Sequence, residues 1–197
     1  MDEEAAPVRV EPVPEPPYVY HYYPRPRPKV VVKRDLLPSL VVALTTFAFG
    51  LPAAYLWSWL APAQLKIVSA QDSKFYPIGV ESYHRLDALM VFVLIGLGAG
   101  VITGIATWLL RQRRGPVVML GMTAGSFAAG WFAQFLGGTL AAGAYPMPST
   151  IKANDTLLVA PALETWWGIM AWPLGAALAY GCCAAWNGLD DLGRRLG

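Results

Sequence analysis

The sequence predicts an all-α polytopic membrane protein, a bundle of four transmembrane helices preceded by an extended proline-rich arm. Three observations predict this fold: four long apolar runs, a one-sided distribution of basic residues, and tryptophans at the ends of the runs. The runs cover residues 36–60, 88–110, 116–142 and 166–186 of the 197-residue chain. At about 1.5 Å per helical residue, each can cross a hydrocarbon core roughly 30 Å thick. Because lipid offers the backbone no hydrogen-bond partners, continuous apolar runs of this length are predicted to be helices.

Composition favours a membrane protein over a soluble one. Hydrophobic residues make up 55% of the chain and charged residues 14%, whereas a soluble domain carries about 25% charged residues. Four buried helices of a soluble protein would need neither interfacial tryptophans nor a sided charge distribution. The basic residues flank the apolar runs and belong to no nucleic-acid-reading motif, so no binding to nucleic acid is expected.

The first element is an arm, residues 1–35, which holds eight of the 17 prolines. Proline fixes φ and removes a backbone donor, so this arm is predicted to be extended and to lack a core of its own. It also carries an aromatic cluster, and two interpretations stay open. In the first, the cluster binds a partner protein while the basic end of the arm lies at anionic lipid headgroups. In the second, the arm is a disordered tail whose basic residues only fix the membrane topology. The cluster consists of Tyr18, Tyr20, Tyr22 and Tyr23.

The transmembrane domain, residues 36–193, is predicted to have both its ends in the cytoplasm. Eleven of the 15 basic residues lie before the first run, in the connector 111–114 or after the last run, including the short basic tail 194–197. Only four lie in the loops 62–87 and 143–165, and basic loops are retained on the cytoplasmic side. Trp57 and Trp59 end the first run, where an interface is expected. The first run is expected to be retained rather than cleaved, because it is longer than the apolar core of a signal peptide.

Small residues recur at every fourth position in the last three runs and predict a tight bundle. Close backbone approach drives association between helices in lipid, and packing inside the bundle is favoured over homodimerisation. Pro173, inside the fourth run, predicts a kink or a loosened turn. The stripes contain Gly96, Gly100 and Gly104 in the second run, Gly121 and Gly125 in the third, and Gly175 in the fourth.

Ionisable residues are nearly absent inside the runs, and polar residues gather toward the outer side. They predict an outer polar cluster with two open interpretations: a lipid-headgroup or proton-responsive site, or interfacial charge that is merely solvated or paired. Of the outer loops, residues 65–79 are predicted to form a small hairpin or a segment on the membrane surface, and residues 146–163 an ordered loop. The cluster consists of His84, Arg85, Asp87, Gln134 and Glu164.

Five short motifs carry a resemblance to a known family. They are Leu56-Trp57-Ser58-Trp59-Leu60-Ala61-Pro62, Arg85-Leu86-Asp87, Arg114-Gly115-Pro116, Val159-Ala160-Pro161 and Asp190-Asp191-Leu192-Gly193. In these motifs the chain resembles an uncharacterised family of small membrane proteins from mycobacteria and related actinobacteria, a domain of unknown function. The resemblance covers roughly residues 36–193 and implies a multi-pass protein of the bacterial inner (plasma) membrane. It supplies no catalytic residues.

The sequence contains no P-loop, dinucleotide fingerprint, zinc motif or nucleophile elbow. It therefore predicts neither an enzyme nor a cofactor or metal site. The expected function is a noncatalytic accessory or assembly subunit of a larger inner-membrane complex, respiratory or of the cell envelope, binding through its small-residue helix faces and its arm. The alternative is a small transporter or lipid-binding protein that uses the outer polar cluster. Membrane lipids and other membrane subunits are the expected partners.

Overall fold

The computed structural model describes residues 32–70, 74–78 and 83–187. Residues 1–31, which include most of the proline-rich arm and its tyrosine cluster, and the tail 194–197 lie outside the described residues, so the predictions made for them stay predictions. The described chain is mostly helical, and it contains the four helices that the apolar runs predict.

Five α-helices build these four spans. They are α1 (Val32–Ala48), α2 (Gly50–Leu60), α3 (Tyr83–Leu109), α4 (Pro116–Ala144) and α5 (Ala171–Ala185). In the described part of the chain, four helical segments are long and apolar enough to cross a membrane: Arg34–Leu60, Leu86–Leu109, Pro116–Ala144 and Trp167–Ala185. The first of these combines α1 and α2.

The first span is interrupted at Phe49, between α1 and α2, and Pro52 explains the interruption. Pro52 has no N–H with which to bond the carbonyl of Ala48, and its ring crowds that carbonyl. The backbone N–H of Phe49 instead donates to the carbonyl of Thr46, at 3.1 Å, as well as weakly to that of Thr45. The result is a local tightening within an otherwise helical span.

The fourth span begins as a 3₁₀-helix, η2 (Trp167–Met170), and becomes α-helical at Ala171. Pro173 is therefore the third residue of α5 rather than an interior residue of a continuous α-helix. In the first turn an N–H has no intrahelical partner, so a proline there costs no hydrogen bond. The irregular turn lies just before Pro173.

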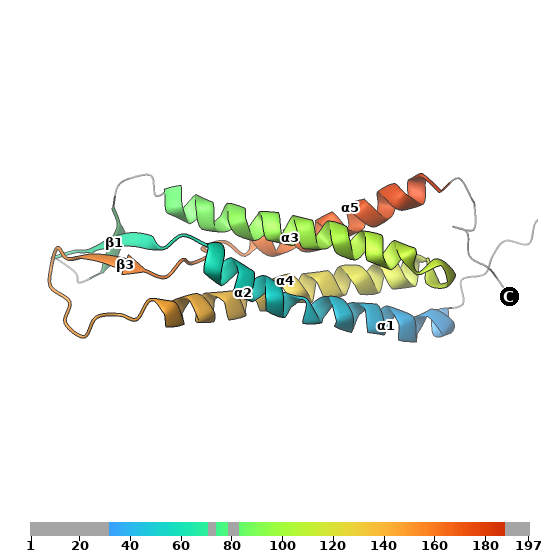
Figure 1. Cartoon of the computed structure of the whole chain (residues 1–197), viewed down its shortest axis with the longest axis horizontal. Coiled ribbons are helices and arrows are strands. Elements are labelled where there is room, and N and C mark those ends of the chain that lie inside the picture. Colours follow the sequence, from blue (N-terminus) through green and yellow to red (C-terminus); the bar gives the residue numbers. More distant parts are fainter. Residues whose placement is uncertain (1–31, 71–73, 79–82, 188–197) are drawn as a thin grey trace, which may run out of the picture.

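The helices form two tight pairs, α3 with α5 and α1/α2 with α4, and the pairs join mainly where α4 meets α5. Figure 1 shows α3 and α5 above α1, α2 and α4. Glycines permit the close approach. A Cβ added to Gly104 would lie 2.5 Å from the carbonyl oxygen of Ala176, and one on Gly125 would lie 2.6 Å from that of Ala43.

The other predicted glycines also face helices of the same chain. Gly96 and Gly100 lie against the start of α5, Gly121 lies against Ser39 of α1, and Gly175 lies against Leu97 of α3. In the described structure the close-approach surfaces of these glycines are thus occupied within the chain, as expected for packing inside the bundle. Binding of another subunit through the small-residue faces stays a prediction.

A three-stranded sheet extends the bundle at one end (Figure 1). Two of its strands form the hairpin that was one of the two alternatives predicted for residues 65–79, whereas the all-α fold class did not include a sheet. Strand β1 (Gln64–Val68) lies between β2 (Phe75–Pro77) and β3 (Thr156–Val159), antiparallel to both. Lys66 pairs with Pro77 on one side and with Leu157 on the other. The two loops between spans thus pair with each other. We call this end of the bundle the sheet end.

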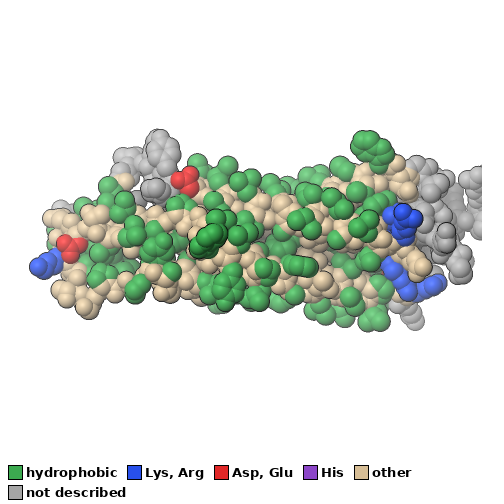
Figure 2. All heavy atoms as spheres, viewed as in Figure 1, with side chains coloured by type: hydrophobic (Ala, Val, Ile, Leu, Met, Phe, Trp, Pro, Cys, Tyr) green, Lys and Arg blue, Asp and Glu red, His purple; other side chains and the backbone are tan. Residues whose placement is uncertain are grey.

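The opposite end carries four arginines, Arg34, Arg111, Arg113 and Arg114, and we call it the basic end. Figure 2 shows hydrophobic side chains along the length of the visible face, whereas Lys and Arg lie at the two ends, most of them at the basic end. Large apolar side chains such as Leu94, Ile102 and Leu120 are more than 60% exposed. This distribution of surface types is compatible with a multi-pass membrane protein.

Candidate functional site

A lateral groove lies between the two helix pairs, on the side where α1/α2 faces α3. Its volume is about 760 Å³. The first span contributes eight lining residues between Val41 and Leu56. The other wall consists of eight residues of α3, from Leu94 to Thr107, and Leu110, which directly follows α3. Trp172 of α5 lies at its back. We call this cavity the groove.

The groove is apolar although four threonines line it. The hydroxyl of Thr45 donates to the carbonyl of Val41 at 2.8 Å, and that of Thr103 donates to the carbonyl of Ala99 at 2.7 Å. The Thr103 hydroxyl also accepts a hydrogen bond from the indole N–H of Trp172 at 3.3 Å. The hydroxyls of Thr45 and Thr103 are thus satisfied within the protein, and most of the other lining residues are apolar, so the groove offers an occupant mostly hydrocarbon.

Trp57 joins α2 to α3 on the sheet-end side of the groove. Its indole N–H donates to the carbonyl of Ala88 at 2.9 Å, and its ring meets Phe92 edge to face with centroids 6.1 Å apart. Gly137 of α4 leaves room for the ring, since a Cβ there would lie 2.8 Å from it. The side chain is fully buried. It therefore holds α2 against α3 while α1 diverges from α3 farther along.

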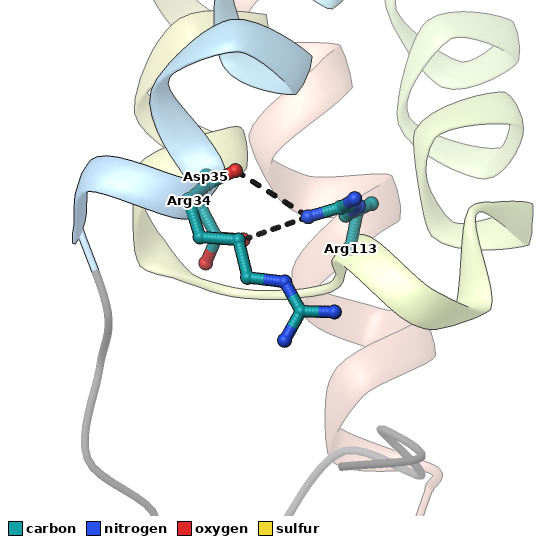
Figure 3. Close-up of polar contacts among 3 residues, drawn as sticks. All are labelled: Arg34, Asp35 and Arg113. Atoms are coloured by element: carbon teal, nitrogen blue, oxygen red, sulfur yellow. Dashed lines mark hydrogen bonds and ion pairs between the residues drawn. The ribbon is translucent and has the colours of Figure 1, made fainter. Parts of the chain in front are cut away.

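Arg113 crosses the groove at the basic end. It lies in the short 3₁₀-helix η1 (Arg111–Arg113) that follows α3. Its Nη1 donates to the carbonyl of Arg34 at 3.3 Å and lies 3.8 Å from a carboxylate oxygen of Asp35 (Figure 3). Asp35 is buried, which strengthens the attraction of its charge to Arg113. The contact ties the end of α3 to the start of α1.

The turn that presents Arg113 is itself fixed by its neighbours. Arg114 stacks on Trp108, with its guanidinium carbon 3.9 Å from the ring centroid, and its Nε donates to the carbonyl of Trp108 at 2.8 Å. Tyr180 meets Trp108 edge to face and accepts a hydrogen bond from the N–H of Gly115 at 3.1 Å. This packing sets the position of η1 relative to α5.

Two further arginines lie at the mouth of the groove at the basic end. Arg111 directly follows Leu110, a lining residue, and its side chain is exposed. Arg34, also exposed, is seven residues before Val41, so the helical repeat places it on the groove side of α1. Within the described residues, four arginines against the single Asp35 leave this mouth strongly positive.

The predicted outer polar cluster is described only in part. Asp87 and Glu164 are exposed at the sheet end and each has an interaction partner. Gln134 is half-buried in α4, ten residues before its end at Ala144. The side chains of His84 and Arg85 lie outside the described part of the structure, so the cluster stays a prediction. Among residues 32–70, 74–78 and 83–187, no three His, Cys, Asp or Glu side chains are placed to hold a metal ion.

Sequence reasoning did not identify the groove. Its lining residues are of the kinds found in any transmembrane span. In the sequence, Asp35 and Arg113 look like charged residues that merely flank the spans. One signal was available: Asp35 stands alone among basic residues at the start of the first span. A single acid there is a candidate partner for the arginines of the connector that follows the second span.

Comparison with known proteins supports the resemblance found in the motifs. The chain is 30% identical over 158 residues to an uncharacterized protein of Mycobacterium leprae, covering 72% of this chain and 80% of that protein. It is 28% identical over 167 residues to uncharacterized proteins of Mycobacterium tuberculosis and Mycobacterium bovis, covering 74% of this chain and 85% of each. No solved structure matches the chain.

A family model matches residues 46–194, a segment that contains α2, α3, α4, α5 and the whole sheet. The matched segment includes the α3 wall of the groove and the arginines of η1, whereas most of α1 precedes it. The prediction of an uncharacterised, mycobacterial-type family is confirmed. The chain belongs to the family described as "Protein of unknown function (DUF2567)".

Proposed function

We propose that this protein is a noncatalytic, lipid-binding protein of the bacterial inner membrane, and that its groove holds an alkyl chain of a membrane lipid. The observation that carries the proposal is the groove itself, an apolar cavity of about 760 Å³ that opens sideways between α1/α2 and α3. In a bilayer, an empty apolar cavity forfeits the dispersion contacts of its whole lining. A flexible hydrocarbon chain restores those contacts and needs no hydrogen-bond partner.

The dimensions favour a slender occupant over a partner helix. On the α3 wall, Leu110 lies 16 positions after Leu94, a distance of about 24 Å at 1.5 Å per residue. A helix of that length, about 10–12 Å across with its side chains, occupies roughly 2,000 Å³. A groove of about 760 Å³ spread over that length is narrow, so a flexible alkyl chain follows it more closely than a helix about 10–12 Å across would.

The accessory-subunit function that the sequence suggests stays a second proposal. A partner subunit would bind surfaces other than the internal glycine faces, such as the proline-rich arm, which lies outside the described residues. Stoichiometric copurification of another membrane protein in mild detergent would support it. Copurification of lipid alone, with the lipid lost when the groove is filled, supports the lipid-binding proposal.

Filling the groove from within tests the proposal, and the chain offers a matched control. Gly98 lines the groove, and a Cβ added there meets nothing within 4 Å. Gly138 of α4 is equally open but does not line the groove. Both substitutions to leucine replace a helical glycine and should raise helix propensity by a similar amount, at most about 1 kcal/mol.

We expect Gly98→Leu to lose about one tightly bound lipid per chain in native mass spectrometry from mild detergent. Gly138→Leu should retain the wild-type number of lipids. Equal lipid retention by the two folded variants would contradict the proposal, because a leucine in the groove competes directly with a chain that occupies it.

A further inference from the structure

We infer that the lipid held in the groove is anionic, and that its phosphate-bearing headgroup lies at the basic end, between Arg111 and Arg34. The inference rests on the proposed function of the groove and adds the chemical class of its occupant and the membrane leaflet from which it comes. It is carried by the placement of charge at one end of the groove.

Arg111 and Arg34 approach the groove mouth from its two walls. Arg111 follows Leu110, the last lining residue of the α3 wall. Arg34 lies on the same face of α1 as Val41 and Thr45, about 10 Å along the helix axis from Val41 at 1.5 Å per residue. A headgroup at the end of a chain in the groove therefore meets a guanidinium from each wall.

The other two arginines are engaged in holding the mouth together. Arg113 contacts Asp35 and the carbonyl of Arg34, and Arg114 is buried against Trp108. Arg111 and Arg34 are both exposed, and neither side chain forms an ion pair with a residue in the described ranges. Guanidinium groups bind phosphate oxygens in a bidentate geometry, which suits a phosphodiester headgroup.

Within the described residues, the sheet end has no pair of arginines at the groove like that of the basic end. The α3 lining begins at Leu94, eleven residues after the start of α3 at Tyr83, or about 16 Å inside the span. Beyond that point Trp57 holds α2 against α3 through Ala88 and Phe92. The lysines of the described sheet end, Lys66, Lys74 and Lys152, lie in the strands and loops beyond the helices. A lipid whose chain fills the groove thus has its headgroup at the basic end.

A competition between two lipids tests the headgroup. The purified full-length chain is titrated in detergent with phosphatidylglycerol or phosphatidylcholine carrying the same acyl chains, and bound lipid is counted by native mass spectrometry. A basic residue near an anionic headgroup contributes about 1 kcal/mol, so two arginines should favour phosphatidylglycerol by about 10- to 30-fold. The double variant Arg34→Gln/Arg111→Gln should lower this preference to about three-fold or less.

Lys152→Gln provides the matched control, because Lys152 is an exposed basic residue at the opposite end. It should retain the full preference for phosphatidylglycerol. A wild-type chain that binds the two lipids equally, or a double variant that keeps the full preference, would overturn the inference. Stabilisation by inorganic phosphate alone equal to that by phosphatidylglycerol would also overturn it, because the acyl chain would then contribute nothing.

The failures of the two proposals are distinguishable. Gly98→Leu should weaken both lipids together, since it removes space for the acyl chain whatever the headgroup. If Gly98→Leu has no effect on either lipid, the groove is not the binding site and the proposed function fails. If Gly98→Leu weakens both lipids but the wild type shows no headgroup preference, the groove binds lipid and only the assignment of an anionic headgroup fails.

Discussion

Trp57 connects three helices through one side chain. It belongs to α2, donates its N–H to the Ala88 carbonyl of α3, and rests against Gly137 of α4. Trp59, two residues later, is 81% exposed. The sequence presents the two residues as one interfacial pair, because both end an apolar run. Only the helix packing separates a buried, hydrogen-bonded tryptophan from one that faces outward.

Trp57→Phe should therefore destabilise the protein, whereas Trp59→Phe should leave its stability nearly unchanged. Phenylalanine retains most of the ring but leaves the buried carbonyl of Ala88 without this donor, at a cost of about 1 kcal/mol or somewhat more. Thermal unfolding in one detergent, followed by circular dichroism, measures the difference. Equal midpoints for the two variants would show that the indole hydrogen bond does not contribute to stability.

At the scale of elements, the glycine stripes determine which helices pair closely. Gly104 is the clearest case, because a Cβ there would lie 2.5 Å from a backbone oxygen of α5 and 2.8 Å from the Cβ of Ala179. A backbone atom cannot move aside by bond rotation as a side-chain atom can. A side chain at position 104 would therefore force α3 and α5 apart. Gly98, on the same helix but facing the groove, has no such neighbour.

Gly104→Ala should thus lower the free energy of unfolding, by about 1–3 kcal/mol as for other overpacked sites. Gly98→Ala should be neutral or slightly stabilising, since alanine has the higher helix propensity. Denaturation of both variants in mixed micelles provides the comparison. A Gly104→Ala variant as stable as Gly98→Ala would mean that α3 and α5 are not in close contact at this position.

The sequence predicted the spans and, as one of two alternatives, the hairpin within residues 65–79. It predicted neither the third strand of the sheet nor the groove, and the reason is the range of the interactions. Span positions follow from local apolar length, and the structure places them within a few residues of the predicted ends. The sheet depends on Gln64 pairing with Val159, across almost a hundred residues. The groove depends on which helix faces stay apart when α3 pairs with α5 and α1 pairs with α4. A stripe of small residues in the sequence does not show which helix will pack against it.

The whole molecule has two unlike ends, and their charges argue for its orientation. The basic end holds four arginines of the described chain, and basic segments beside spans are retained in the cytoplasm. We propose, as the sequence predicts, that both termini lie in the cytoplasm and that the sheet lies outside. Under this orientation the headgroup bound at Arg111 belongs to the cytoplasmic leaflet.

Labelling of single cysteines tests the orientation. In a chain whose two natural cysteines, Cys182 and Cys183, are replaced by serine, Lys152→Cys should react with a membrane-impermeant maleimide on intact cells. Arg111→Cys should react only after the membrane is permeabilised. Both natural cysteines lie toward the basic end of α5, so their removal does not affect the sheet. The reverse labelling pattern would place the basic end outside.

The sideways opening between α1/α2 and α3 determines how any occupant arrives. A molecule already dissolved in the bilayer slides in from its neighbours without crossing water, so its supply is set by its mole fraction in the membrane and not by its aqueous concentration. Dilution of a sample with buffer would leave occupancy almost untouched. Dilution with a second, competing lipid would displace the lipid bound in the groove. Binding strength is therefore best expressed as a mole fraction of lipid in the membrane.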